Sequence, residues 1–379
     1  MRVKPALVAG IVAAVITAAI SHVRATPYDN FVYLAQAWLH GHSWIDWPGA
    51  WIDALPYNGR YYVIEGPLPA VLLLPFVAAF GLHANQTLIS ILLCGVAIGA
   101  AWELGERFEL PRASIAWICA FLLAGTDLLW CATFGDVWFI AHVSAVAFTL
   151  LALAEIAGER RPWLVALWGA CAFESRFSLL LTIPVYFALL GAPKQWKPVT
   201  AQFAAVLVPI AVLWLWYNQA RWGTWSDIGY TAWYHQDHAG MPSGSPFRFE
   251  YFPYQLWSFF VQAPTQLTEF PGWRPEISGV ALTWTSPALV LAFFARSPLR
   301  WIVALWILVL LAAAPNFLYY VNGFAQFGMR HALDFEPFLV ALMMLAVRDR
   351  FPNWGYVLIA YSCVMGFWGI WYWQTFIRT

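Results

Sequence analysis

The sequence predicts an all-α polytopic membrane protein, and two features of its composition lead to that prediction. Of the 379 residues, 61% are hydrophobic and only 11% are charged. A soluble domain of this length needs a larger polar surface than so few charged residues can supply. The apolar residues also gather in runs of about 20 residues, which is the length that crosses a bilayer as a helix.

The same composition argues against several other classes of protein. Lys and Arg together number 20, as do Asp and Glu, so the formal net charge of zero argues against a nucleic-acid partner. The five Cys lie inside apolar runs and form no CxxC pair, which supports neither a disulfide framework nor a zinc site. No P-loop, GxGxxG, GxSxG or HExxH motif occurs, so nucleotide hydrolysis and the common hydrolase or zinc-protease designs are unsupported.

The apolar runs predict a bundle of about 11 transmembrane helices. The first run, residues 5–23, is interpreted as a retained span, because it lacks a clean cleavage site and many further runs follow it. The further runs cover residues 85–105, 113–132, 137–157, 163–175, 177–191, 199–218, 278–295, 300–319, 332–347 and 354–374. Residues 1–379 are therefore expected to form a single transmembrane domain without a separate soluble domain.

The basic residues predict which side of the membrane each connection faces. Six short segments contain two basic residues each, and the positive-inside rule places them in the cytoplasm with the N-terminus: residues 1–4, 105–112, 158–163, 192–198, 295–300 and 347–351. Residues 66–83 contain three Pro and are barely long enough to cross. If they crossed fully, the basic segments that follow would face the outside, so residues 66–83 are predicted to lie in or along the outer leaflet. Two long outer loops result, at about residues 24–84 and 219–277.

The first outer loop begins with a segment that is apolar on one side at helical spacing. Gly41 suits the end of that helix, and Gln36 and His40 are expected to face water. The apolar face comprises Phe31, Leu34, Ala35, Trp38 and Leu39. This pattern predicts a juxtamembrane helix that lies on the outer surface.

Two carboxylates lie at the outer ends of predicted spans, where an acid is costly and therefore a functional candidate. Asp29 follows the first span, and its alternative interpretation is a polar helix end solvated by lipid headgroups. Asp136 opens a later span, where an N-cap or first-turn acid is the alternative. Two acids at the same outer depth favour a shared site.

Three arginines are candidate phosphate ligands, because the guanidinium fork fits phosphate oxygens. Arg60 and Arg330 lie in outer segments, against the positive-inside tendency. Arg176 lies deeper in an apolar run with Glu174 nearby, so an internal ion pair at a helix break is as well supported as a ligand role.

The order of these elements resembles the GT-C glycosyltransferases, which include the protein O-mannosyltransferases and the aminoarabinose transferase of lipid A. The resemblance begins with the first span, Asp29 and the amphipathic helix. It continues through "GRYYVIEGPLPAVLLLPF", "YNQARWGTWSDIGY" and "GFAQFGMRHALDFEP". It covers most of the chain and rests on the order of the motifs.

The resemblance implies a GT-C-like bundle that moves a sugar from a polyprenyl-phosphate donor to an extracytoplasmic glycan, lipid or protein, with inversion at the anomeric carbon. It implies the inner membrane of a bacterium, with the active site on the periplasmic side. Asp29 matches the first-loop acid, as general base or acceptor-orienting group, and Asp136 matches the second outer acid. Both are candidate ligands for a divalent metal, Mg or Mn.

The remaining expected roles concern the two substrates. Glu65 stands near where some relatives have a phosphate-binding Lys, so Arg60, Arg330 and Arg176 are expected to bind the donor phosphate instead. Substrate contacts are expected from Glu65, Tyr28, His331, Trp233 and Tyr230. Two other classes of function stay open, a transporter or flippase with ionisable groups at the membrane midplane, and a non-catalytic scaffold of the cell envelope.

Overall fold

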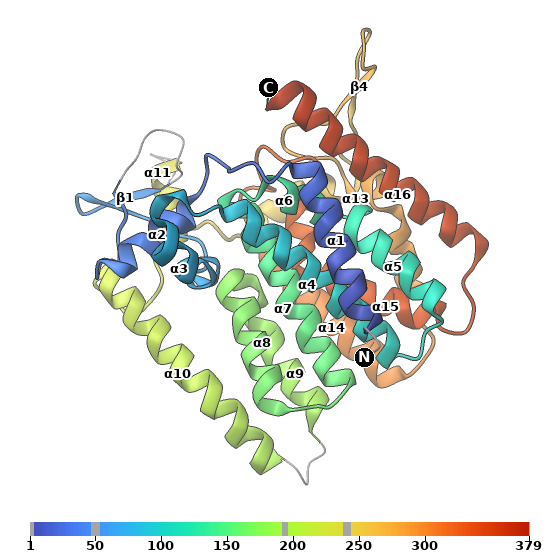
Figure 1. Ribbon diagram of the computed structural model, residues 1–379, viewed down its shortest axis with the longest axis horizontal. Helices are drawn as coiled ribbons and strands as arrows, with labels where there is room; N and C mark the ends of the chain where they lie inside the picture. Colours follow the sequence, from blue (N-terminus) through green and yellow to red (C-terminus); the bar gives the residue numbers. More distant parts are fainter. Residues whose placement is uncertain (1–3, 47–53, 192–195, 238–243, 379) are drawn as a thin grey trace.

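The computed structural model describes residues 4–46, 54–191, 196–237 and 244–378 as a mainly helical bundle (Figure 1). Within these ranges, five helices are long and apolar enough to cross a bilayer. They are α4 (Gln86–Arg107), α7 (Val137–Ala157), α10 (Trp196–Trp222), α14 (Leu299–Phe317) and α16 with the π-helical turn η7 (Asn353–Ile377). The total of about 11 spans therefore stays a prediction. The shorter apolar helices are the candidates for the remaining spans.

The other helices of the bundle match the predicted apolar runs in position. They are α1 (Pro5–Ser21), α5 (Arg112–Ala124), α6 (Leu128–Phe134), α8 (Pro162–Ser175), η2 (Phe177–Thr182), α9 (Ile183–Leu190), α13 (Leu282–Thr285), η5 (Pro287–Phe294), η6 (Arg330–Asp334) and α15 (Glu336–Val347). Several predicted spans are thus divided into shorter pieces. The run at 332–347, for example, begins as the 3-10 helix η6 and continues as α15.

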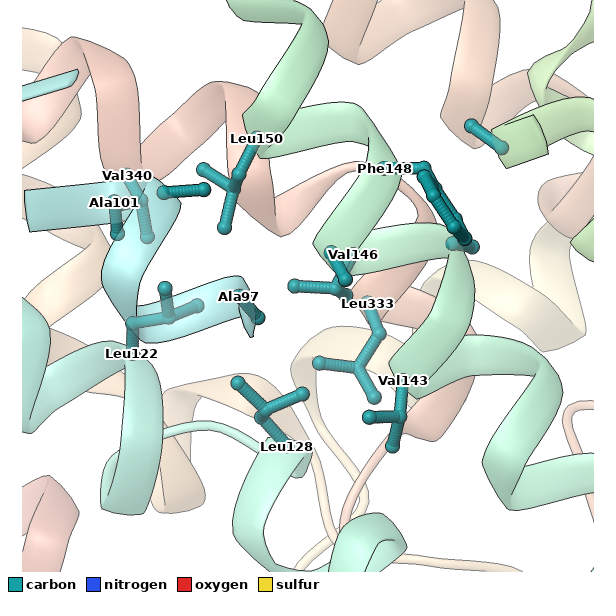
Figure 2. Close-up of a cluster of buried hydrophobic side chains, with 14 of the residues drawn as sticks. Ala97, Ala101, Leu122, Leu128, Val143, Val146, Phe148, Leu150, Leu333 and Val340 are labelled. Carbon is teal, nitrogen blue, oxygen red and sulfur yellow. The ribbon is translucent and has the colours of Figure 1, made fainter. Parts of the chain in front are cut away.

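Helix α7 forms the centre of the bundle, with 89% of its most apolar stretch buried. It packs between α4 and α8 and also contacts α6 and η6. Figure 2 shows Val143, Val146 and Leu150 of this helix in the buried cluster that also contains Ala97 of α4 and Leu333 of η6. A helix that is apolar on every side has to be covered on every side, which explains its central place.

Helices α1 and α4 approach closely because glycines line their contact. A Cβ atom at Gly10 would lie 2.7 Å from the carbonyl oxygen of Gly95, and one at Gly95 would lie 2.8 Å from that of Gly10. Small residues at such a crossing allow the two backbones to pack together in a membrane. This contact attaches the first span to the centre of the bundle.

The predicted span at 113–132 is bent by 50° between α5 and α6. The hydroxyl of Thr126 donates to the Leu122 carbonyl at 2.6 Å and accepts from the Leu128 amide at 3.2 Å. Because this side chain satisfies backbone groups on both sides of the break, the helix can end and restart inside the bundle. Asp127 is thereby placed at the start of α6.

The predicted juxtamembrane helix is present as α2 (Asn30–Leu39), and Gly41 follows it with a φ of 76°. The amide of Gly41 donates to the Trp38 carbonyl at 3.0 Å, so the glycine closes the helix as predicted. Phe31, Leu34 and Ala35 of the predicted apolar face are buried, whereas Leu39 is 48% exposed.

The rest of the two predicted outer loops is made of short elements. The first loop continues with β1 (Leu55–Tyr57), β2 (Arg60–Tyr62), α3 (Leu68–Phe80) and η1 (Gly81–His83). The second contains α11 (Gly229–Asp237), η4 (Phe249–Tyr251), α12 (Phe252–Phe260), β3 (Thr265–Gln266) and β4 (Trp273–Arg274). Residues 47–53 and 238–243 of these loops lie outside the described residues. Figure 1 shows α11, β4 and the C-terminus in the upper part of the view, away from the N-terminus.

We predict that Gly10→Val destabilises the protein, because the added side chain collides with the α4 backbone. Overpacking of this kind costs about 1–3 kcal/mol. Thermal unfolding in detergent measures the effect, and Ala19→Val, at an exposed position of the same helix, is the matched control. Equal unfolding temperatures for the two variants would contradict the close packing of α1 on α4.

Candidate functional site

A cavity of about 1520 Å³ lies among segments that are far apart in the sequence. Its walls include residues 24–28 of the first outer loop, 133–139 around the start of α7, 227–236 around α11 and 315–325 after α14. Residues 373–378, at the end of the described chain, complete the wall. The four segments that the basic residues predict to face the outside thus surround one space.

Asp334 organises the buried side of this cavity. Its side chain has no solvent exposure and accepts hydrogen bonds from four residues. The donors are Arg176 Nε and Nη2 at 3.1 Å each, His142 Nδ1 at 3.0 Å, Ser178 Oγ at 2.6 Å and Asn316 Nδ2 at 2.9 Å. A buried carboxylate is stable only when its charge is paired and its lone pairs are filled, as they are here.

Arg176 lies at the break between α8 and η2 and lines the cavity. The nearby Glu174 was the expected partner for an internal ion pair, but the structure pairs Arg176 with Asp334, 158 residues further along the chain. The reason is the end of α8 at Ser175, after which Arg176 adopts an extended conformation. Its Nε and Nη2 hold Asp334, and Nη1 takes no part in that pair.

Arg330 is the second cation at the cavity wall, and it is only 6% exposed. Its Nη1 donates to the Phe324 carbonyl at 2.8 Å, while its Nε is buried without a hydrogen-bond partner. Within the described part of the chain, Arg330 forms no ion pair with a carboxylate. The buried carboxylates of Asp127 and Asp136 interact with the charge of Arg330 at longer range, so the protein compensates this cation in part. An anionic ligand in direct contact with the guanidinium would complete that compensation.

Asp136 also lines the cavity, with 1% exposure. It is the N-cap residue of α7 by position, as its alternative interpretation predicted, but its side chain makes no capping bond. The carboxylate instead pairs with Arg378 and accepts the hydroxyl of Thr26. The Arg378 guanidinium also lies 4.5 Å from the Phe134 ring centre.

Asp29 precedes α2 and does not line the cavity, although the adjacent Tyr28 does. The Tyr28 carbonyl accepts the Val137 amide at 2.9 Å, so the loop that carries Asp29 is fastened to the start of α7 beside Asp136. Burial raises the pKa of the Asp29 carboxyl to about 6. This backbone bond joins the two segments that carry the predicted acids, and of the two acids Asp136 lines the cavity and Asp29 does not.

The other predicted substrate contacts also line the cavity, namely Glu65, Tyr28, His331, Trp233 and Tyr230. Tyr230 packs edge-on against Phe177 at 6.0 Å and against Tyr319 at 6.1 Å. Glu65 lies near the helix break, because the next residue, Gly66, packs directly against the backbone of Glu174. A Cβ atom at Gly66 would collide with that backbone. The cavity thus combines aromatic faces with the guanidinium groups of Arg176 and Arg330.

Arg60 lies apart from these residues. It belongs to β2, its side chain is exposed, and its guanidinium stacks 3.5 Å above the Trp44 ring centre. It does not line the cavity.

Sequence reasoning missed three residues of this arrangement: Asp334, His142 and Arg378. Asp334 and Arg330 lie four residues apart in the motif "RHALD", so their proximity had a local signal. The pairing of Arg378 with Asp136 had none, because the two residues are 242 positions apart.

The residues offer a poor set of ligands for the divalent metal that the resemblance implies. The structure, over its described ranges, contains no group of three or more His, Cys, Asp or Glu side chains that could hold a metal ion. The Asp136 carboxylate is occupied by Arg378 and Thr26, and a metal would have to displace both.

A helical membrane bundle with a cavity lined by aromatic and charged side chains is the class that these observations define. No model of a known protein family matches the sequence, and no curated protein matches it. A solved structure is similar, the crystal structure of ArnT from Cupriavidus metallidurans bound to undecaprenyl phosphate. The identity is 17% and the TM-score is 0.55, over 94% of this chain and 63% of that one.

At this identity the similarity concerns the fold alone. It supports the GT-C-like bundle that the resemblance predicted, while this chain spans a little under two thirds of the length of ArnT.

We predict that Asp334→Ala strongly destabilises the protein, because Arg176 and His142 lose their shared partner inside the bundle. Removing one member of a buried ion pair costs about 3–5 kcal/mol. Unfolding in detergent measures the loss, and Asp349→Ala, whose side chain is 81% exposed, is the control. A loss no larger than that of the control would show that Asp334 does not organise the site.

Proposed function

We propose that this chain is an inner-membrane glycosyltransferase that moves a sugar from a polyprenyl-phosphate donor to an extracytoplasmic acceptor. The main support is the buried cation Arg330, which forms no salt bridge among the described residues, at the wall of a large cavity that Arg176 also lines. Two guanidinium groups with free N–H donors fit the oxygens of a phosphate. The similar ArnT structure was solved with undecaprenyl phosphate bound, which supports the same class of ligand here.

The proposed reaction forms a bond between an acceptor oxygen or nitrogen and the anomeric carbon, and breaks the bond from that carbon to the phosphate oxygen. The polyprenyl phosphate leaves with one more negative charge, which Arg330 and Arg176 stabilise. The acceptor loses a proton. One displacement inverts the anomeric carbon.

Asp29, which lies one residue outside the cavity wall, is the proposed proton acceptor for an acceptor group bound at the cavity edge. Its pKa of about 6 makes it a stronger base than an ordinary Asp while it remains ionised at neutral pH. Asp136 is proposed to shape the outer rim of the site, because its charge is compensated by Arg378. Trp233 and Tyr230 offer flat surfaces to the sugar and the isoprenoid chain.

We predict that Arg330→Gln lowers the affinity for undecaprenyl phosphate by about 10-fold to 100-fold, the value of a charge-assisted hydrogen bond. Arg60→Gln removes the same charge outside the cavity and is the matched control, so its affinity should not change. Titration of the purified protein in nanodiscs measures both variants. Equal losses for the two variants, or no loss for Arg330→Gln, would refute the proposed phosphate site.

A transfer assay with a panel of polyprenyl-phosphate sugars tests the function itself. Wild-type protein that binds the lipid phosphate but moves it across the bilayer without sugar transfer would favour a flippase. Wild-type protein that binds no lipid phosphate would favour a scaffold.

We predict that the transfer rate rises with pH and levels off above about pH 6, because a base acts only after losing its proton and the pKa of Asp29 is about 6. Asp29→Asn should lower the rate by about 100-fold or more and remove this rise. Asp46→Asn, an exposed acid of the same loop, is the control. Undiminished transfer by Asp29→Asn would remove Asp29 from the mechanism.

A further inference from the structure

The carboxyl group of Asp127 is buried next to the segment that carries Arg330. Asp127 stands at the break between α5 and α6, is 6% exposed, and does not line the cavity. Its Oδ2 is buried without a hydrogen-bond partner, as is Nε of Arg330. Buried polar atoms without partners are rare, so a carboxyl and a guanidinium that each have one require an explanation.

The chain just before Arg330 packs directly on this acid. A Cβ atom at Gly328 would lie 2.4 Å from Asp127 Oδ1, so only a glycine lets the backbone come this close. The Asp127 carboxyl also interacts with the backbone amide of Gly328. Asp127 therefore supports, from inside the bundle, the segment that brings Arg330 to the cavity wall, where Arg330 donates to the Phe324 carbonyl.

Asp127 differs from Asp136, the other acid that interacts with Arg330, because no adjacent cation neutralises it. Asp136 is held by Arg378. Among the described residues Asp127 forms no salt bridge, and the cation with which it interacts is Arg330, at longer range. Its negative charge therefore reduces the attraction of Arg330 for an anion without occupying the guanidinium.

A second buried acid lies near Asp127. Glu336, the first residue of α15, is 1% exposed, has an unpartnered Oε2 and interacts with Asp127. Two neighbouring buried carboxyl groups rarely both ionise, and the positive charge of Arg330 favours ionisation of the one that interacts with it. The negative charge of this pair is therefore assigned to Asp127.

The two lipids that the proposed reaction exchanges differ in charge. The donor is a phosphodiester with one negative charge, whereas the released polyprenyl phosphate is a monoester that carries up to two at neutral pH. A site made of guanidinium groups alone would hold the more highly charged product more tightly than the donor. A fixed negative charge beside Arg330 opposes this preference, because its repulsion grows with the charge of the ligand.

We propose that Asp127 is a positioning residue for Arg330, and that its charge limits the affinity for the released polyprenyl phosphate and so favours exchange of this product for a new donor. This inference rests on the proposed function. Asp127 touches neither lipid, because it lies outside the cavity wall, and it acts through Arg330.

The test compares undecaprenyl phosphate with an undecaprenyl-phosphate hexose, using the full chain in nanodiscs. Asp127→Asn removes the charge and keeps an oxygen for the Gly328 amide. It should bind undecaprenyl phosphate about threefold to tenfold more tightly than the wild type, the size of a longer-range charge interaction in a protein, and gain less for the hexose-linked donor. Glu336→Gln, which changes the neighbouring buried acid, is the matched control and should keep both wild-type affinities.

A double variant keeps the proposal testable if Asp127→Asn fails to fold because Arg330 has lost its compensating charge. Arg330→Gln combined with Asp127→Asn removes both charges and leaves this part of the bundle neutral. It should bind undecaprenyl phosphate more tightly than Arg330→Gln alone, since the carboxylate no longer repels the ligand.

Three results would overturn the proposal: wild-type affinities for both lipids in Asp127→Asn, equal gains for the two lipids, or the same gains in Glu336→Gln. Weaker binding of both lipids by Asp127→Asn would show a purely structural role and overturn it as well. Failure of the wild-type protein to bind undecaprenyl phosphate would instead refute the proposed function, and the inference with it.

Discussion

The ion pair between Asp334 and Arg176 is the interaction on which the cavity depends. It joins the break between α8 and η2 to the end of η6, and Asp334 also holds His142 of α7 and Asn316 of α14. These bonds lie in a buried, apolar environment, where each would be costly to leave unmade. The same carboxylate therefore fixes the positions of four segments and sets the orientation of an arginine at the cavity wall.

Charge compensation distinguishes the arginines of the cavity from one another. Arg176 is balanced by Asp334 and Arg378 by Asp136, whereas the buried Arg330 forms no salt bridge among the described residues and interacts with Asp127 and Asp136 only at longer range. Arg24 also lines the cavity, but it is exposed to solvent. A site that binds an anion needs a net positive charge that the protein does not itself neutralise. This difference explains why Arg330, rather than the exposed and stacked Arg60, is assigned to the donor phosphate.

The candidate site was predictable in part. The cost of ionisable groups at membrane depth drew attention to Asp136 and Arg176. Arg330 was chosen because it lies in a predicted outer segment, against the positive-inside tendency. All three residues line the cavity. Asp29 was chosen for its place at the end of the first span, and the fold puts it one residue from the cavity wall. Arg60 was chosen for its charge and its predicted outer position. Neither property predicts the direction of a side chain in an exposed hairpin, and Arg60 stacks on Trp44 outside the cavity.

The sequence by itself determined the membrane class, the positions of most helices and the amphipathic helix α2, because hydropathy and helical periodicity are local properties. The basic residues between the apolar runs also predicted which segments face the outside. Only the tertiary structure decided which charges are paired. Asp334 meets Arg176 across 158 positions and Arg378 meets Asp136 across 242, and no local pattern specifies contacts between such distant segments.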